Sequence, residues 1–225
     1  MPSLPPLLTN HGSLLVLDAA STVTQVGLLR AGSAPIWHRT AEDAGTGIFT
    51  GAAAVVKEAS LGIEAVGAFV FCEGPGSMLG TRTIAMALRT WQVLQPRPVY
   101  SYRSLAVAGR LEWTQRPRAF TVMADARRDA WHCQPIGPEG TVATLQRLPS
   151  PRLPGGELVM PENFRSWTPL PAKVASCSYD LARIFSALEA GDFFTTNTAP
   201  DALRHEAPDY RKWSAQVHRA PADRP

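Results

Sequence analysis

Residues 13–29, SLLVLDAASTVTQVGLL, decide the fold of this chain. A short apolar run ends on Asp18, a small polar turn follows, and a second apolar run begins at Val23, which is the pattern of two strands joined by a turn. Residues 120–136, FTVMADARRDAWHCQPI, repeat this form in the second half of the chain, with Asp125 in the place of Asp18. A unit of strand, aspartate, turn and strand that occurs twice predicts two related α/β lobes and not one doubly wound sheet.

The other elements follow from apolar periodicity and from the glycines and prolines that interrupt it. We expect strands over residues 34–38, 65–72, 98–101, 141–148 and 174–177, and helices over residues 49–61, 81–94, 104–113 and 181–188. Ser104 is expected to cap its helix. We expect little regular structure in residues 1–12 and 149–171, and fraying beyond Pro221. The first lobe is expected over residues 13–104 and a second, shorter lobe over residues 105–220.

Composition excludes several classes of protein. The chain has 225 residues, of which 45% are hydrophobic and 18% charged, so it can bury a core. The net charge is only +3 and the densest basic run is Ala126-Arg127-Arg128, which is not typical of a nucleic-acid-binding protein. Three widely spaced cysteines with no C-x-x-C exclude a disulfide framework and a zinc knuckle.

Membrane and export signals are also missing from the sequence. The N-terminal stretch has no Lys or Arg before Arg30 and does not fit a secretory signal. The longest strongly apolar run, residues 65–72, is far shorter than the roughly 20 residues that span a bilayer. We therefore expect a cytoplasmic protein with no membrane contact.

Asp18 and Asp125 end the first strand of each expected lobe, so they can face each other across a cleft. Tight turns at these places would present backbone N–H groups to phosphates while the carboxylates hold the accompanying cation. Alternatively, each aspartate only caps its own turn, which is the stronger interpretation for either residue alone.

Gly74-Pro75-Gly76-Ser77 joins a buried strand to a helix. Gly74, Gly76 and Ser77 could cradle an anion at the helix N-terminus, where unpaired N–H groups and the helix dipole point. The loop is not a Walker A motif, because no Gly-Lys-Ser/Thr follows. A tight turn, in which glycine lets the helix pack closely on the sheet, explains the same residues equally well.

The sequence supports no other catalytic arrangement. The five histidines are scattered, and no G-x-S-x-G is present. Cys133 directly follows His132, so their side chains would point to opposite faces of a strand. The tryptophans, including Trp91, Trp113 and Trp131, are not interleaved with basic residues, which favours core or interface positions over a platform for bases. We assign no catalytic residue and no metal ligand.

The helices expected over residues 49–61 and 81–94 are rich in small residues, which allow close approach of another helix. Such helices could form an interface with a partner subunit. The candidate interface residues are Val55, Ala59, Arg82, Met86 and Arg89. Ordinary packing on the sheet is the stronger interpretation for any one of them.

Four blocks in this order resemble the TsaB family, also called YeaZ, which comprises accessory subunits for threonylcarbamoyladenosine synthesis on bacterial tRNA. They are LLVLDAAS at residues 14–21, FVFCEGPGSMLGTR at 69–82, YRSLAVA at 102–108 and VMADARR at 122–128, with a fainter match at APDYRKW, 207–213. The similarity covers residues 13–136 well. The order of several blocks is far more specific than any one of them.

This resemblance implies an ASKHA (actin, sugar kinase, Hsp70-like) fold of duplicated α/β lobes, each with a mixed sheet flanked by helices. It implies a non-catalytic partner of TsaD, the transferase that modifies adenosine 37 of tRNA. A homodimer when alone, a TsaE-like ATPase as a further partner and only indirect contact with tRNA are expected. No tightly bound cofactor is expected, and ATP or ADP with Mg would bind only weakly or in a complex.

The sequence departs from the family pattern at several places. Met78-Leu79 stands where the family has Phe-Thr, and Ser176-Cys177-Ser178 stands where relatives carry Gly-Asp-Gly. Loss of those glycines removes close backbone approach to a nucleotide, which argues against independent ATP binding. Two alternatives from other classes remain: an ATP-dependent phosphotransferase of the sugar or acetate kinase type, and an M22-type glycoprotease-like peptidase.

Overall fold

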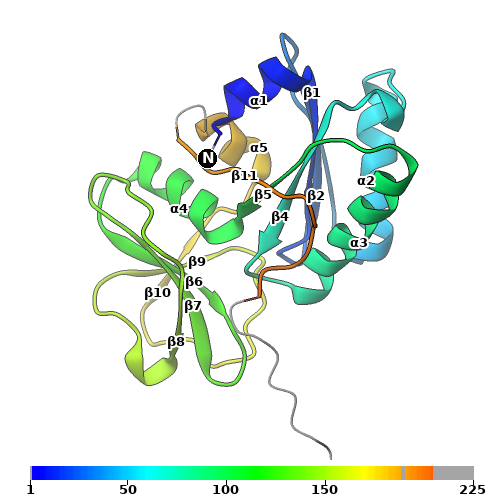
Figure 1. The fold of residues 1–225 in the computed structure, drawn as a ribbon. Helices are drawn as coiled ribbons and strands as arrows, with labels where there is room; N and C mark the ends of the chain where they lie inside the picture. Colours follow the sequence, from blue (N-terminus) through cyan, green and yellow to red (C-terminus); the bar gives the residue numbers. More distant parts are fainter. Residues whose placement is uncertain (1, 189–190, 205–225) are drawn as a thin grey trace, which may run out of the picture.

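The computed structural model describes residues 2–188 and 191–204 (Figure 1). The strands are β1 (Ser13–Asp18), β2 (Thr24–Arg30), β3 (Ile36–Thr40), β4 (Ala68–Gly74), β5 (Val99–Arg103), β6 (Phe120–Asp125), β7 (Ala130–Ile136), β8 (Gln146–Pro149), β9 (Leu158–Pro161), β10 (Val174–Cys177) and β11 (Thr195–Thr196). The α-helices are α1 (Leu4–His11), α2 (Ala44–Glu58), α3 (Met78–Leu94), α4 (Ser104–Gln115) and α5 (Leu181–Ala187), and the 3-10 helices are η1 (Ile63–Ala65) and η2 (Ser150–Arg152).

Two mixed sheets repeat one topology. The first has the strand order β11-β5-β4-β1-β2-β3, and the second has the order β10-β9-β6-β7-β8. In each sheet an antiparallel hairpin, β1-β2 or β6-β7, carries a third antiparallel strand on one side and parallel strands on the other. The predicted α/β fold of duplicated lobes is therefore confirmed, with β11 added to the edge of the first sheet.

Both faces of the first sheet are covered, which explains the continuous apolar runs of β1 and β4. Helices α2 and α3 lie side by side on its outer face, where Leu17, Ile48 and Leu88 belong to one buried cluster (Figure 1). Helices α4 and α5 lie on the inner side, toward the second lobe, and a second buried cluster there includes residues of both sheets. The two lobes thus share a core.

Within the described residues, the second lobe has fewer regular elements than the first, with five strands in its sheet against six. Helices α2 and α3 occupy the connections β3–β4 and β4–β5 of the first lobe. The equivalent connections of the second lobe, within residues 150–173, contain only η2 and loops. These loops bring residues 162–168 toward the first lobe, where Thr22 N–H donates to the Asn163 carbonyl at 2.8 Å.

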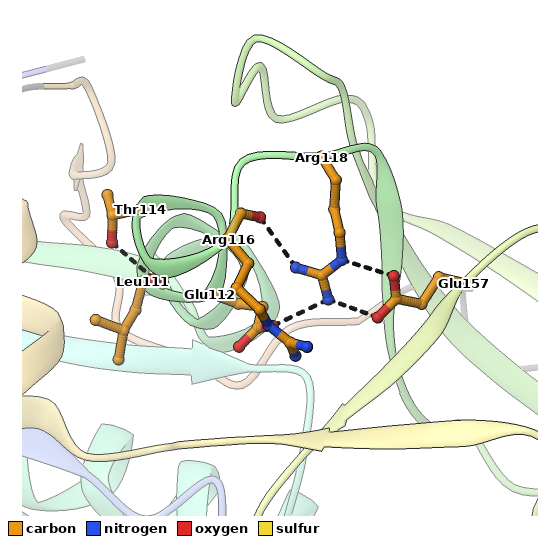
Figure 2. Close-up of polar contacts among 6 residues, drawn as sticks. All are labelled: Leu111, Glu112, Thr114, Arg116, Arg118 and Glu157. Atoms are coloured by element: carbon orange, nitrogen blue, oxygen red, sulfur yellow. Dashed lines mark hydrogen bonds and ion pairs between the residues drawn. The ribbon is translucent and has the colours of Figure 1, made fainter.

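An ion cluster fixes α4 to the second sheet (Figure 2). The buried Glu112 carboxylate accepts from Arg116 at 2.7 Å and from Arg118 at 3.0 Å. Arg118 also pairs with Glu157 through two nitrogens, at 2.6 and 2.5 Å, and stacks over the Phe120 ring. These contacts tie the end of α4 to the start of β6 and to the residue before β9.

Four expectations for local structure were wrong. The strand expected over residues 141–148 is confined to β8, with only an isolated bridge between Ile136 and Val142 before it. Residues 4–11 form α1, because prolines in the first helical turn need no N–H partner and Leu4 and Leu7 are buried. Residues 158–161, expected to be irregular, form β9, which pairs with β6 and β10. Ser104 is not a cap: Arg103 holds that position, and the buried Ser104 hydroxyl donates to the Pro75 carbonyl.

The first-lobe helices begin earlier than the apolar pattern indicates. Asp43 accepts from Thr46 N–H and caps α2 at Ala44, and Ser77 accepts from Gly80 N–H and caps α3 at Met78. The expected lobe boundary near residue 104 coincides with the start of α4, whereas β11 pairs with β5 in the first sheet. Residues 207–213 and the tail beyond Pro221 lie outside the described residues.

Candidate functional site

A cavity of about 650 Å³ lies between the lobes and is the candidate site. The first lobe lines it with the β1–β2 turn, the N-terminus of α2 and the β4–α3 turn. The second lobe contributes the β6–β7 turn and residues 164–167. Its size is in the range of small-molecule sites, about 300–1,000 Å³.

Asp18 does not face this cavity. Its side chain is fully buried, and its Oδ2 accepts from the hydroxyls of Tyr102 and Tyr179, each at 2.6 Å. Its Oδ1 accepts from Ala20 N–H at 2.8 Å. Both carboxylate oxygens therefore have donors from the protein itself.

Burial is the main influence on the pKa values of Asp18, Tyr102 and Tyr179. It raises the pKa of the Asp18 carboxyl, and the hydrogen bonds from Tyr102, Tyr179 and Ala20 only partly offset this increase. Burial and the Asp18 charge raise the pKa of both tyrosine hydroxyls well above the ordinary value. The tyrosines thus remain protonated donors at neutral pH.

Gln25, across the hairpin from Asp18, strengthens the same connection. Its side-chain N–H donates to the Tyr179 carbonyl at 2.9 Å, and its carbonyl oxygen accepts from Leu181 N–H at 3.0 Å. Asp18 and Gln25 together hold the β10–α5 connection against the first sheet. Tyr179 directly follows Ser178, so its phenol ring comes from the segment where the sequence lacks the glycines that the resemblance implies.

The β4–α3 turn packs directly on the β1–β2 turn. A Cβ atom on Gly76 would overlap the Ala20 carbonyl oxygen, and one on Gly80 would overlap that of Ala19. Ser77 N–H donates to the Ala20 carbonyl at 2.7 Å, and the Ser77 hydroxyl caps α3. Of the two interpretations of this turn, the geometry therefore favours close packing of the helix over an anion cradle.

Gly74 has a φ of +115°, in the region that favours glycine, which accounts for its place at the strand end. Gly74 and Asp18 do not line the cavity, whereas Gly76, Ser77 and Asp125 do. The structure thus brings three of the five candidate phosphate-turn residues to one cavity.

Asp125 stands at the cavity wall and holds two loops together. Its Oδ1 accepts from Arg127 N–H at 2.5 Å, and its Oδ2 accepts from Trp167 N–H at 2.5 Å and Thr168 N–H at 2.7 Å. Burial alone would raise the pKa of this carboxyl, but the backbone donors of Thr168, Arg127 and Trp167 together lower it. Asp125 is thus an ionised turn cap.

The pair of aspartates does not fit a magnesium–phosphate unit. A cation ligand needs carboxylate oxygens that reach the ion, and those of Asp18 are buried and accept hydrogen bonds from Ala20, Tyr102 and Tyr179. Among the described residues no group of three or more His, Cys, Asp or Glu could hold a metal ion.

The candidate interface residues differ in exposure. Val55 is 1% exposed and belongs to the core cluster under α2, so its side chain does not reach a surface that a partner could touch. Ala59 is half-buried at the end of α2. Arg82 and Met86 are exposed on α3, whereas the Arg89 guanidinium donates to the Pro200 carbonyl at 2.7 Å.

Tyr102, Tyr179 and Gln25, which lie around Asp18 and its connection to the second lobe, and Trp167, which lines the cavity, are not among the residues predicted from the sequence. Tyr179 and Asp18 are 161 residues apart in sequence, and neither tyrosine lies in a motif that implies its partner. A glutamine within the buried part of β2 was the one available signal, since a buried amide needs partners.

No protein-family model matches the chain, and no curated protein sequence matches it. None of the described helices is long and apolar enough to cross a bilayer.

Two solved structures match over most of their length. YeaZ from Pseudomonas aeruginosa is 19% identical with a TM-score of 0.61, covering 79% of this chain and 90% of its own. A protein described as similar to peptidase YeaZ from Pseudomonas aeruginosa is 20% identical with a TM-score of 0.61, covering 78% of this chain and 89% of its own. The chain therefore has the fold of YeaZ, which is the fold that the sequence blocks predict.

Proposed function

We propose that this chain is a non-catalytic, TsaB-like subunit that binds a TsaD-like transferase in the cytoplasmic machinery that makes threonylcarbamoyladenosine at position 37 of tRNA. The YeaZ fold and the ordered sequence blocks support this proposal. In it the transfer chemistry belongs to the partner, and a TsaE-like ATPase is a further partner.

Six exposed, large apolar side chains on α2 and α3 carry the proposal. We call this set the α3 face: Phe49, Met78, Leu79, Met86, Val93 and Leu94, of which Met78 and Leu79 also line the cavity between the lobes. These side chains are between 47% and 84% exposed on α2 and α3, which is unusual for so many large apolar residues on one pair of helices.

The spacing on α3 favours a helix as the contact. Leu79, Met86 and Val93 recur every seven residues, which places them in one stripe along the helix. Leu79 is 77% exposed and Val93 is 84% exposed, so the stripe is open along its length. The same stripe can serve a homodimer when the partner is absent.

The observations give no support to the two enzymatic alternatives. The buried and fully bonded Asp18 argues against a phosphotransferase that needs it as a magnesium ligand. For a peptidase, Cys72, Cys133 and Cys177 are all buried, and burial raises the pKa of each thiol, which disfavours the reactive thiolate.

Co-purification tests the proposal. The chain and the TsaD-like protein of the same organism, co-expressed and passed over a sizing column at micromolar concentration, should elute as one complex. Met86→Glu should separate them, because it places a charge in an apolar contact. Leu170→Glu is the matched control: Leu170 is 55% exposed outside the α3 face, so its complex should persist.

Two results would count against the proposal. One is separate elution of the two unaltered proteins. The other is equal retention of the complex by Met86→Glu and Leu170→Glu, since this would show that the α3 face is not the contact.

A further inference from the structure

The second-lobe wall of the cleft carries an exposed indole next to arginines. Trp167 is 63% exposed, and the Arg127 guanidinium carbon lies 4.3 Å from its ring centroid. Arg165 and Arg82 line the same cavity and are exposed. We call Trp167 and these three arginines the cleft rim. Within the described part of the chain, neither Arg82 nor Arg165 has a hydrogen bond or ion pair from its side chain.

Among the described residues, no ion pair joins the acidic residues of the cavity to these arginines. Glu42 accepts from the Thr50 hydroxyl at 3.2 Å, and Asp43 accepts from Thr46 N–H at 3.1 Å as the cap of α2. Asp125 accepts from three backbone N–H groups. These three carboxylates keep their negative charge, but they do not occupy the guanidinium N–H donors, which can therefore bind an anion from outside.

The backbone holds the aromatic and basic groups in place. Arg127, Arg128 and Asp129 have φ values of 62°, 54° and 51°, a run of left-handed conformations that side chains disfavour. Asp125 fixes one side of this turn, and Ser150 N–H donates to the Asp129 carbonyl on the other at 2.9 Å. Asp125 also binds the N–H of Trp167, so one carboxylate positions both members of the stacked pair.

One face of the indole is open to a ligand. Arg127 covers one face of the ring, and a side chain that is 63% exposed presents the other to solvent. A planar ring can stack on that open face while guanidinium groups bind adjacent phosphates. The chemistry matches a nucleobase with flanking phosphates.

We infer that the cleft rim binds an unpaired base and its neighbouring phosphates in single-stranded RNA. A free nucleotide is disfavoured as the source, because the first-lobe turns that would cradle its phosphates are closed by the contact of Gly76 and Ser77 with Ala20. A duplex is disfavoured because its bases are already stacked. The choice of RNA over DNA rests on the proposed function.

This inference revises two sequence-based expectations, that tRNA is contacted only indirectly and that no tryptophan is combined with basic residues. Trp167, Arg127 and Arg82 come from three separate segments, so their proximity cannot be recognised in the linear order. A net charge of only +3 does not reveal a local group of arginines that form no ion pair with the acidic residues of the same cavity.

Fluorescence anisotropy with the full chain and a labelled oligoadenylate of about ten nucleotides tests the inference. Trp167→Ala should weaken binding about tenfold, whereas Trp167→Phe should retain most of the affinity, because an aromatic face is kept. Arg165→Ala should weaken binding and flatten its salt dependence. Arg183→Ala, which removes the same charge from the exposed surface of α5, should leave the affinity and its salt dependence unchanged.

Several outcomes would overturn the inference: no binding of the oligonucleotide at millimolar protein, equal binding by Trp167→Ala and the unaltered chain, or equal affinity for a duplex of the same length or for Mg·ATP. Displacement of the oligonucleotide by oligoglutamate at matched concentration would assign the rim to an acidic peptide instead. A thermal melt of Trp167→Ala should show a folded protein, since the side chain is exposed.

The test separates this inference from the proposed function. Met86→Glu should lose the transferase and still bind the oligonucleotide. Trp167→Ala should keep the transferase and bind the oligonucleotide more weakly. If the complex with the transferase forms but the oligonucleotide does not bind, the inference fails and the proposed function stands.

Discussion

Asp18 and Asp125 occupy equivalent positions in the two lobes and have opposite surroundings. Each ends the first strand of its sheet, yet Asp18 is fully buried under two tyrosine hydroxyls, whereas Asp125 caps two loops at the cavity wall. The pKa of Asp18 is raised by burial, and that of Asp125 is lowered by backbone donors despite its partial burial. The same position in the two sheets thus connects the lobes in one case and holds two surface loops together in the other.

The residue across each hairpin extends this difference. Gln25 pairs with Asp18 and bonds to the chain around Tyr179, whereas Trp131 pairs with Asp125 and bonds within its own lobe to the Ser150 hydroxyl. The polar side chains of the first hairpin therefore bond to the other lobe, whereas Trp131 of the second hairpin bonds within its own lobe.

The largest effect is expected from Asp18→Ala. It removes the acceptor of two buried tyrosine hydroxyls and leaves a cavity, so we expect a loss of about 3–5 kcal/mol in the free energy of unfolding. Asp125→Ala removes a partly exposed loop cap and should cost only about 1–2 kcal/mol. Urea denaturation followed by circular dichroism measures both; equal losses would remove the distinction between the two positions.

The next largest loss of stability is expected from Gln25→Leu. It keeps side-chain volume but leaves the Tyr179 carbonyl and the Leu181 N–H without partners in a buried place. We expect a loss of about 2–3 kcal/mol in the free energy of unfolding. A change below the error of a denaturation curve would show that the β10–α5 connection does not depend on the first hairpin.

The dependence of stability on pH should have opposite signs at the two positions. The pKa of Asp18 in the folded protein is above its ordinary value of 3.8, so its contribution to stability is complete at low pH and is lost as the pH rises through the folded pKa. The pKa of Asp125 is below 3.8, so its contribution is complete at neutral pH and is lost as the pH falls through the folded pKa.

Unfolding at a series of pH values measures these signs. As the pH is lowered, the unaltered chain should gain stability relative to Asp18→Asn and lose it relative to Asp125→Asn. The same sign for both variants would contradict the assigned environments.

The smallest effect is expected at the ion cluster of Figure 2. Glu157 is 38% exposed at its side chain, so solvent screens its pair with Arg118. Glu157→Gln should cost about 0.5 kcal/mol, and less in high salt. A salt-independent loss as large as that of Asp18→Ala would contradict this. It would mean that solvent exposure does not explain why the Glu157–Arg118 pair contributes less to stability than the hydrogen bonds of Asp18.

Local patterns were sufficient to predict most of the fold. Alternation and short apolar runs indicate β1, β2, β3 and β10, and the repeated hairpin indicates the two lobes. Residues 4–11 and 158–161 were missed, because proline and glycine near them suggested irregular structure while burial of Leu4, Leu7 and β9 decides the outcome.

The candidate site was predictable only in part. Asp18 and Asp125 stand out at strand ends, but the partners that determine their roles come from distant segments. Tyr179, which bonds to Asp18, lies 161 residues away in the connection between β10 and α5. Trp167, which contacts Arg127, lies in the irregular segment between β9 and β10. Such contacts depend on how the lobes pack, which a one-dimensional pattern does not contain.

The most direct test of the account is a double-mutant cycle between Asp18→Ala and Tyr179→Phe, measured as free energies of unfolding in urea. If Asp18 is a structural joint to the second lobe, the two changes are not additive, and the coupling energy is at least about 1 kcal/mol. Additivity within about 0.5 kcal/mol would contradict the account, because it would show that the buried aspartate does not hold Tyr179 in place.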